Sequence, residues 1–202
     1  MPLITPTRRG CGGRACLFLF AVPWTAFAVF WVVMAAATGP WWFALFGVPF
    51  VLVGLALLIA SMLPAIVGMK VGRSSASLSR DPARIGETVQ FAYVLPFRRS
   101  AVVDRVEMRF VFRETAAYQR GTDTVTENHD LELDSHRDQP GALRAGQAYR
   151  LEKTLLVPPD GMHSFAAPNN KLRYLVLIHA ALAGWPDLNE EFEVRVLPEE
   201  AS

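Results

Sequence analysis

Residues 17–69 read LFLFAVPWTAFAVFWVVMAAATGPWWFALFGVPFVLVGLALLIASMLPAIVGM and contain no Asp, Glu, Lys, Arg or His. A helix that spans a bilayer needs about 20 apolar residues. The stretch contains two such runs, residues 17–38 and 41–67, separated by Gly39-Pro40. Because Gly and Pro together end a helix, we predict two transmembrane helices joined by a tight turn. Two tryptophans directly after the turn suit the aromatic belt at a membrane interface.

The charges that flank this stretch predict its orientation. Six basic residues and no acid lie beside the two spans: Arg8, Arg9, Arg14, Lys70, Arg73 and Arg80. Cytoplasmic flanks of membrane helices carry an excess of Lys and Arg, whereas the turn here is uncharged. We therefore predict a multi-pass protein of the cytoplasmic (inner) membrane, with both termini and the domain after the spans in the cytoplasm. The excess of arginine over lysine suggests a GC-rich bacterial source.

A cleavable signal peptide is the alternative interpretation of the first span. The N-terminus is basic, and Ala35-Ala36-Ala37 resembles a cleavage site. However, the first apolar run is longer than the roughly 7–15 residues of a signal-peptide core, and a second span follows almost at once. We favour the uncleaved hairpin. Cys11 and Cys16 precede the first span, where Cys16 is placed for palmitoylation, although a free thiol is the simpler interpretation.

Small residues recur at heptad spacing on both predicted helices. They are Ala21, Ala28 and Ala35 on the first, and Gly47, Gly54, Ser61 and Gly68 on the second. Stripes of small residues let two membrane helices approach closely. We predict that the two helices of one chain pack through these stripes, with a homodimer seam as the alternative. Neither span contains an ionisable residue, which argues against an ion channel or pump.

We predict three parts in the chain: a short basic cytoplasmic N-terminus at residues 1–16, the helical hairpin at 17–69, and a soluble β domain over residues 70–202. Apolar residues alternate with mainly charged ones from Val106 to Arg113, with Val111 the exception, which indicates a half-buried strand. Residues 174–178 are apolar throughout, as in a central strand. Further strands are expected at 75–79, 88–94, 122–127, 149–157 and 192–196, with an irregular or edge segment at Asn128-His129-Asp130. We predict an antiparallel β-sandwich of about seven strands, either arrestin-like or immunoglobulin-like.

Three motifs in the last third of the chain carry a resemblance. Leu156-Val157-Pro158-Pro159-Asp160, then His163-Ser164-Phe165, then Lys171 to Val176 resemble a stretch of the arrestin-like sandwich, in which a strand ends at Pro and a strand with a central Tyr follows. Gly184-Trp185-Pro186-Asp187 is similar to the turn before the final strand of such a domain. The resemblance, concentrated in residues 156–197, is to small bacterial two-helix membrane proteins with one arrestin-like sandwich. It implies a protein-interaction module and no catalysis.

The residues themselves offer little catalytic or cofactor chemistry. His129 and His136 lie in an acidic segment without diagnostic metal-ligand spacing, and His163-Ser164 lies in a turn context without a nucleophile elbow. No phosphate-binding loop exists, and bases alternate with acids, which argues against nucleotide and nucleic-acid partners. The β domain has no cysteine. We predict no enzyme activity, no cofactor and no metal site.

One surface position is a candidate contact with a partner, namely Trp185 with its neighbours Pro186 and Asp187. Tryptophan is enriched among interface anchors, but we favour the interpretation that Trp185 folds back onto the sandwich core. Three functions follow as hypotheses. The favoured one is a membrane-anchored module that recruits a protein partner through an edge strand or loop. The second is an accessory subunit assembled through the helical hairpin, and the third is an enzyme or metal-dependent protein of unfamiliar type.

Overall fold

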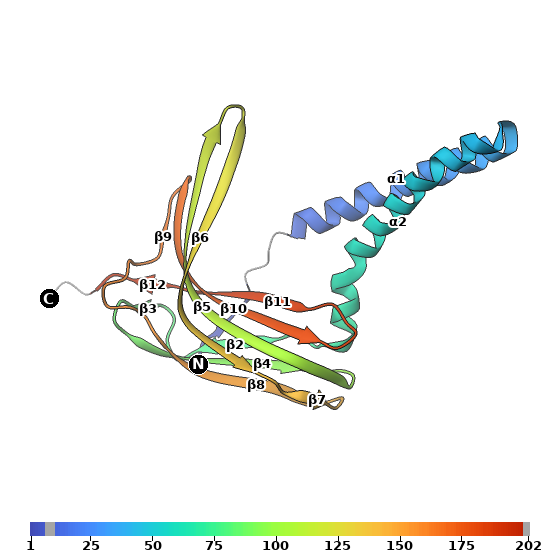
Figure 1. Cartoon of the computed structure of the whole chain (residues 1–202). Coiled ribbons are helices and arrows are strands. Elements are labelled where there is room, and N and C mark those ends of the chain that lie inside the picture. The colour runs from blue at the N-terminus through green and yellow to red at the C-terminus, as the bar shows by residue number, and fades with distance from the viewer. Residues whose placement is uncertain (7–10, 200–202) are drawn as a thin grey trace. The chain divides into compact units, whose positions relative to one another are not determined.

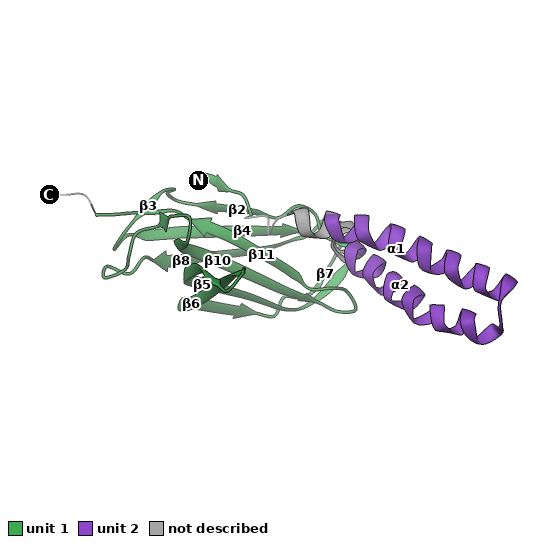
Figure 2. Cartoon of the chain, turned by 90° about the horizontal axis from the view of Figure 1, so that it is seen from above, with its two compact units in different colours: residues 1–7, 67–202 green, residues 8–66 purple. Residues whose placement is uncertain are grey.

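A computed structural model describes residues 1–6 and 11–199, without the side chains of residues 11–15 and 63–69. The chain forms two compact units: residues 8–66 form the helical unit, and residues 1–7 with 67–202 form the β unit (Figure 2). Several residues named above lie outside the described backbone or side chains: Arg8, Arg9, Cys11, Arg14 and Gly68.

Two long helices make up the apolar third of the chain. Helix α1 covers Cys11–Thr38 and helix α2 covers Trp41–Lys70. The turn lies at Gly39-Pro40 as predicted. The Gly39 amide still donates to the Ala35 carbonyl (2.9 Å), whereas proline has no amide proton and suits the start of a helix. Both helices are long and apolar enough to cross a membrane, so they are compatible with a membrane hairpin.

The described residues of the β unit form twelve strands, where the sequence predicts about seven. Two-residue strands account for much of the difference, because they are too short to produce a visible alternation. One pair, β12 with β3, is parallel, so the sheet structure is mostly rather than wholly antiparallel. The strands are β1 Leu3–Ile4, β2 Ser75–Leu78, β3 Ala83–Arg84, β4 Thr88–Pro96, β5 Ala101–Arg120, β6 Asp123–Asp138, β7 Gly141–Leu143, β8 Ala148–Leu156, β9 Phe165–Ala166, β10 Asn170–Leu182, β11 Leu188–Val194 and β12 Val196–Leu197.

Two sheets enclose one apolar core. The first has the strand order β1-β2-β4-β8, and the second has the order β11-β10-β5-β6, with β7 and β9 added to β5 and β10. Aromatic rings meet between the sheets: the Tyr93 and Phe192 ring centroids lie 5.8 Å apart. On the second sheet, Phe110 stacks on Tyr174 at 5.9 Å. The alternation seen in the sequence at residues 106–112 therefore marks the inner face of β5.

The N-terminal segment belongs to the β unit, which the sequence pattern does not reveal. Strand β1 pairs antiparallel with β2, Leu3 opposite Ser77, and Pro6 forms a bridge to Phe192 of β11. Ile4 is only 7% exposed and joins the core. The chain therefore starts in the β unit, leaves it for the two helices, and returns to it at β2.

Candidate interaction surface

The longest exposed element of the β unit is the hairpin of β5 and β6 (Figure 1). The two strands pair from Val106 opposite Asp138 to Arg120 opposite Asp123, and Gly121 supplies the positive φ (68°) of the turn. Strand β10 accompanies β5 only as far as Ala116. Beyond that point the hairpin continues as two strands alone, so it projects past the rest of its sheet.

Strand β6 is the edge of the second sheet. It pairs with β5 along one side, and no strand among the described residues pairs with its other side. The segment Asn128-His129-Asp130, expected to be irregular or at an edge, lies in the middle of this edge strand. Its backbone amides and carbonyls on the free side are available to a further strand, which is how exposed edges recruit other chains.

The side chains of β6 are strongly acidic. The strand carries six acids against one arginine, Arg137, so a strand that joins this edge meets negative charge. All of the side chains of β6 are exposed or half-buried, and Leu131 presents an apolar side chain that is 55% exposed. The acids are Asp123, Glu127, Asp130, Glu132, Asp134 and Asp138.

An ion pair fixes the middle of β6 to its sheet. The guanidinium of Arg113 on β5 donates from Nε to Asp130 Oδ1 (2.6 Å) and from Nη2 to Asp130 Oδ2 (2.7 Å). This bidentate geometry makes such an ion pair strong. It also reaches Glu191 on β11 at 3.4 Å. The hydrogen bonds from Arg113 hold the pKa of Asp130 below its ordinary value, and those to Asp130 raise the pKa of Arg113.

Further polar contacts stiffen the hairpin on both sides of this pair. Toward the tip, the Tyr118 hydroxyl donates to Glu127 (2.7 Å), and this bond is the main cause of the raised pKa of Tyr118. Toward the base, Lys153 of β8 lies 3.5 Å from Asp134, which links the edges of the two sheets. Arg137 pairs with Glu107. Side-chain contacts on both sides of the Arg113–Asp130 pair therefore hold the hairpin, and the outer edge of β6 has no strand paired with it among the described residues.

Trp185, the predicted partner contact, is less exposed than the edge of β6. Trp185 lies in the turn between β10 and β11, half-buried against the core, and its amide donates to Leu182 (3.0 Å). The ammonium of Lys70 lies 4.4 Å from the centroid of its ring, a cation–π contact. Pro186 is half-buried beside it, and Asp187 is exposed, with Oδ2 3.6 Å from His179 Nε2. Trp185 thus packs toward the core, whereas Asp187 faces solvent.

The histidines and Ser164 show no catalytic arrangement among the described residues. The Ser164 hydroxyl accepts a hydrogen bond from the Val196 amide (3.0 Å), so it serves the backbone of β12. His179 Nδ1 lies 2.9 Å from the Asn189 side-chain oxygen. His129 is exposed on β6. No group of three or more His, Cys, Asp or Glu side chains in the described part of the chain could hold a metal ion.

A polar contact between the sheets has no signal in the sequence pattern. The Tyr93 hydroxyl of β4 donates to Glu190 Oε2 of β11 (2.7 Å), and the Ser74 hydroxyl donates to Oε1 (2.6 Å). Tyr93 is fully buried, and burial followed by the charge of Glu190 raises its pKa far above the ordinary value. The partners are 97 positions apart, so no local pattern could have found them.

The small residues of the helical unit lie between the two helices. Ala21, Ala28 and Ala35 of α1 are at most 8% exposed. A Cβ added to Gly47 would lie 2.5 Å from Val32, and one added to Gly54 would lie 3.2 Å from the Cα of Thr25. Ser61 is half-buried, with its hydroxyl donating to the Leu58 carbonyl (2.7 Å). The free thiol of Cys16 is exposed.

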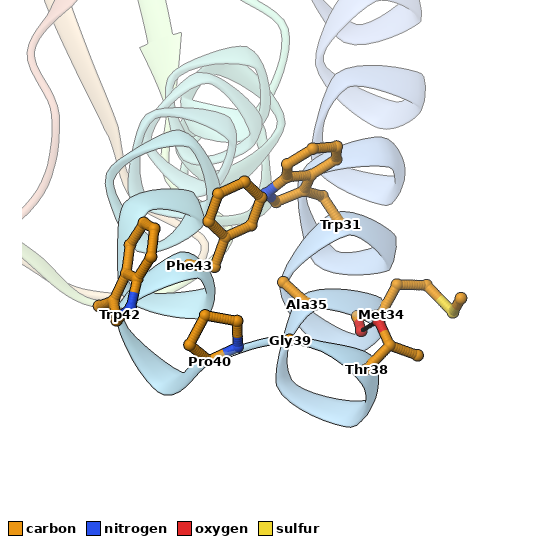
Figure 3. A pocket seen from close by; sticks show the side chains of 8 residues that line it. All are labelled: Trp31, Met34, Ala35, Thr38, Gly39, Pro40, Trp42 and Phe43. Carbon is orange, nitrogen blue, oxygen red and sulfur yellow. Dashed lines mark hydrogen bonds between the residues drawn. The ribbon is translucent and has the colours of Figure 1, made fainter.

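Aromatic side chains surround the turn of the helical unit. Trp31 and Phe43 face each other across the two helices with ring centroids 5.9 Å apart, and Trp42 meets Phe43 edge-on at 5.2 Å. These side chains line a pocket of about 340 Å³ that also includes Gly39 and Pro40 (Figure 3). The turn thus carries the aromatic surface expected of a segment at a membrane interface.

Comparison with known proteins identifies no family for this chain. No protein-family model matches the chain, and no curated protein matches it. Among solved structures, the chain is similar to the crystal structure of Spo0M, a sporulation control protein from Bacillus subtilis, with a TM-score of 0.49 and 12% sequence identity. The match covers 63% of this chain and 49% of that one. No functional conclusion follows from a likeness of this size.

Proposed function

We propose that the protein is a membrane-anchored, non-catalytic interaction module. The helical hairpin anchors it in the cytoplasmic membrane, and the arrestin-like β unit lies in the cytoplasm. There it recruits a protein partner by strand addition to the open edge of β6. The observation that carries the proposal is this edge: a sixteen-residue strand at the border of its sheet, whose outer part projects beyond the core and whose side chains are mostly exposed.

The placement of β1 supports the anchor and its sidedness. Residues on both sides of the two helices belong to one folded unit, because β1 pairs with β2. A chain that leaves this unit and returns to it crosses a membrane an even number of times. Cleavage after Ala37 would remove β1 and the buried side chain of Ile4, so the fold argues against a signal peptide. The basic flanks then favour the cytoplasmic side.

The charge of β6 indicates the kind of segment that it binds. Strand addition supplies main-chain hydrogen bonds for affinity, and side chains on the joining strands give specificity. Asp130 is already neutralised by Arg113, but Glu132 is exposed and forms no ion pair within the described part of the chain. An extended partner segment with Lys or Arg beside apolar residues fits this edge and the exposed Leu131.

Assembly of a larger complex through the hairpin is the second candidate. The small residues that motivated this hypothesis already pack between the two helices of one chain, since Gly54 contacts Thr25 and the α1 alanines are buried. A hairpin partner would therefore have to use the lipid-facing side chains. This makes the edge of β6 the better supported route to a partner.

Site-specific photocrosslinking in intact cells at native expression tests the proposal. A photoreactive residue replaces Thr126 or Glu132 on β6, and matched controls carry it at Thr154 or Glu152 on β8. Strand β8 is the edge of the other sheet and does not project. We expect one protein adduct from the β6 positions and little or none from β8.

A shortened hairpin serves as the second variant. Replacing residues 118–125 with Asn-Gly keeps Ala117 opposite Thr126 and creates a two-residue turn. It also retains the hydrogen bond from the Ala117 amide to Asn169. The adduct from Glu132 should weaken in this background, because less edge is offered. Equal adducts from β6 and β8, or none from either β6 position, would reject β6 as the recruiting edge.

A further inference from the structure

Two loops of the β unit lie beside the residue where α2 ends. The amides of Arg98 and Arg99, in the loop between β4 and β5, both donate to the carbonyl of Lys70, at 2.8 and 3.3 Å. Lys70 is the last residue of α2. The loop between β4 and β5 is therefore fixed beside the point where the apolar helix enters the β unit.

The loop between β7 and β8 joins the same cluster. The Gly146 amide donates to the Phe97 carbonyl (2.8 Å), and the Phe97 amide donates to Gln147 (2.8 Å). The Arg144 amide is held by the Gln147 side chain at 2.7 Å. Figure 1 shows these turns at one end of the two sheets. Backbone hydrogen bonds thus hold Arg144 near Arg98 although the two lie on separate loops.

This end of the β unit has a strong positive charge. Segments 70–74, 97–100 and 144–147 contain five basic residues and no acid. Four of the five side chains are exposed, and the fifth, Lys70, is half-buried over Trp185. None of the four exposed arginines forms an ion pair with an acid in the described part of the chain. We call these residues the basic rim: Lys70, Arg73, Arg98, Arg99 and Arg144.

We propose that the basic rim binds the phosphates of anionic phospholipids at the surface of the membrane in which the hairpin is anchored. The inference rests on the proposed membrane anchoring and is independent of the partner at β6. Arginine offers a planar fork of donors that matches phosphate oxygens. Lys and Arg beside an anionic leaflet are each attracted to it over about one Debye length.

The position of the rim favours a lipid over a soluble anion or an acidic protein. Lys70 is covalently continuous with the apolar helix, and the two loop arginines are hydrogen-bonded to its carbonyl. Headgroups are the ligands that any residue at the end of a membrane span meets first. The chain thereby gains a second attachment, which restrains the β unit at the membrane surface.

Native mass spectrometry of the full-length protein in mild detergent tests the inference. The protein receives equal amounts of phosphatidylglycerol and phosphatidylcholine, and the lipids that it retains are counted. The rim variant is Arg98→Gln/Arg99→Gln/Arg144→Gln. The control variant, Arg80→Gln/Arg120→Gln/Arg195→Gln, removes the same charge from exposed sites elsewhere on the β unit. A third variant, Arg98→Lys/Arg99→Lys/Arg144→Lys, keeps the charge.

The wild type and the control variant should prefer phosphatidylglycerol. The rim variant should lose that preference by about 100-fold, from roughly five-fold for each arginine. The lysine variant should retain most of it. Equal retention by the rim variant and the wild type, or displacement of the lipid by inorganic phosphate alone, would overturn the assignment. Carbonate washing of membranes distinguishes a failure of the proposed anchoring from a failure of the proposed lipid binding. Loss of the whole chain from the washed membranes contradicts the anchoring. A chain that stays in the membranes but shows no lipid preference contradicts only lipid binding by the basic rim.

Discussion

Substitution of Gly54 by leucine should open the contact between α1 and α2. A Cβ at Gly54 would lie 3.1 Å from the Cβ of Thr25 and 3.2 Å from its Cα, and still nearer to its hydroxyl. Carbon atoms in good contact lie about 3.5–4.0 Å apart. A rotation of Thr25 relieves the hydroxyl contact but cannot move its Cα, so the helices themselves must separate.

The expected cost follows from this geometry. Overpacking of a close-packed contact costs about 1–3 kcal/mol, and the larger leucine side chain places Gly54→Leu at the upper end of that range. Gly54→Ala adds only the Cβ and should cost less. Combining Gly54→Ala with Thr25→Ala removes the clash with the hydroxyl but leaves the backbone and Cβ of residue 25 in place, so the pair should recover part of the loss.

Steric trapping of the full-length protein in bicelles measures the free energy of unfolding of the helical unit. Ala60→Leu on α2 is the matched control, because Ala60 is exposed and should accept the added bulk at little cost. The double-mutant cycle between positions 54 and 25 should give a coupling energy of about 0.5 kcal/mol or more. Equal stability of Gly54→Leu and Ala60→Leu would refute packing of the two helices through their small residues.

Three further predictions concern the β unit. Tyr93→Phe removes a buried hydrogen bond to the Glu190 carboxylate and should lower the free energy of unfolding by about 1.5–3 kcal/mol in chemical denaturation. Because Arg113 lowers the pKa of Asp130, the ion pair stabilises the fold above the ordinary Asp pKa of 3.8. This stabilisation is lost as the pH falls through the lowered pKa, so the melting temperatures of wild type and Asp130→Asn should converge in acid. Ile4→Ala should cost about 2–5 kcal/mol, since this side chain is buried in the core; an unchanged denaturation midpoint would contradict a structural role for β1.

The elements with strong periodicity could be predicted from the sequence. The uncharged runs and Gly39-Pro40 give both helices and their turn, because an unbroken apolar run of about 20 residues is typical of a helix that can span a membrane. The alternation from Val106 to Arg113 gives the inner face of β5, because opposite faces of a strand alternate. The prediction of two apolar helices followed by a mostly antiparallel β domain is confirmed.

The elements that depend on distant pairing could not be predicted. The sequence predicts only the start of β6 as a strand, over residues 122–127, because the side chains that follow are mostly polar. The hydrogen bonds that extend the strand to Asp138 come from β5. Strand β1 has two residues and depends on β2, which lies more than 70 positions away. The basic rim exists because backbone hydrogen bonds hold the loop of Arg98 against Lys70, and the loop of Arg144 against Phe97. The sequence identifies Lys70 and Arg73 as the basic flank of the second span, but Arg98, Arg99 and Arg144 are visible in it only as separate surface charges.

Topology mapping in living cells is the decisive test of the membrane hairpin and of the side on which the β unit lies. A reporter that is active only in the cytoplasm, fused after Ser202, should be active, and a reporter that is active only outside should be active when inserted between Gly39 and Pro40. This pattern is expected if both helices cross the membrane and the β unit, with β1 in it, lies on the cytoplasmic side. An inactive cytoplasmic reporter at the C-terminus, or an inactive external reporter at the turn, would contradict this topology and the anchored module that depends on it.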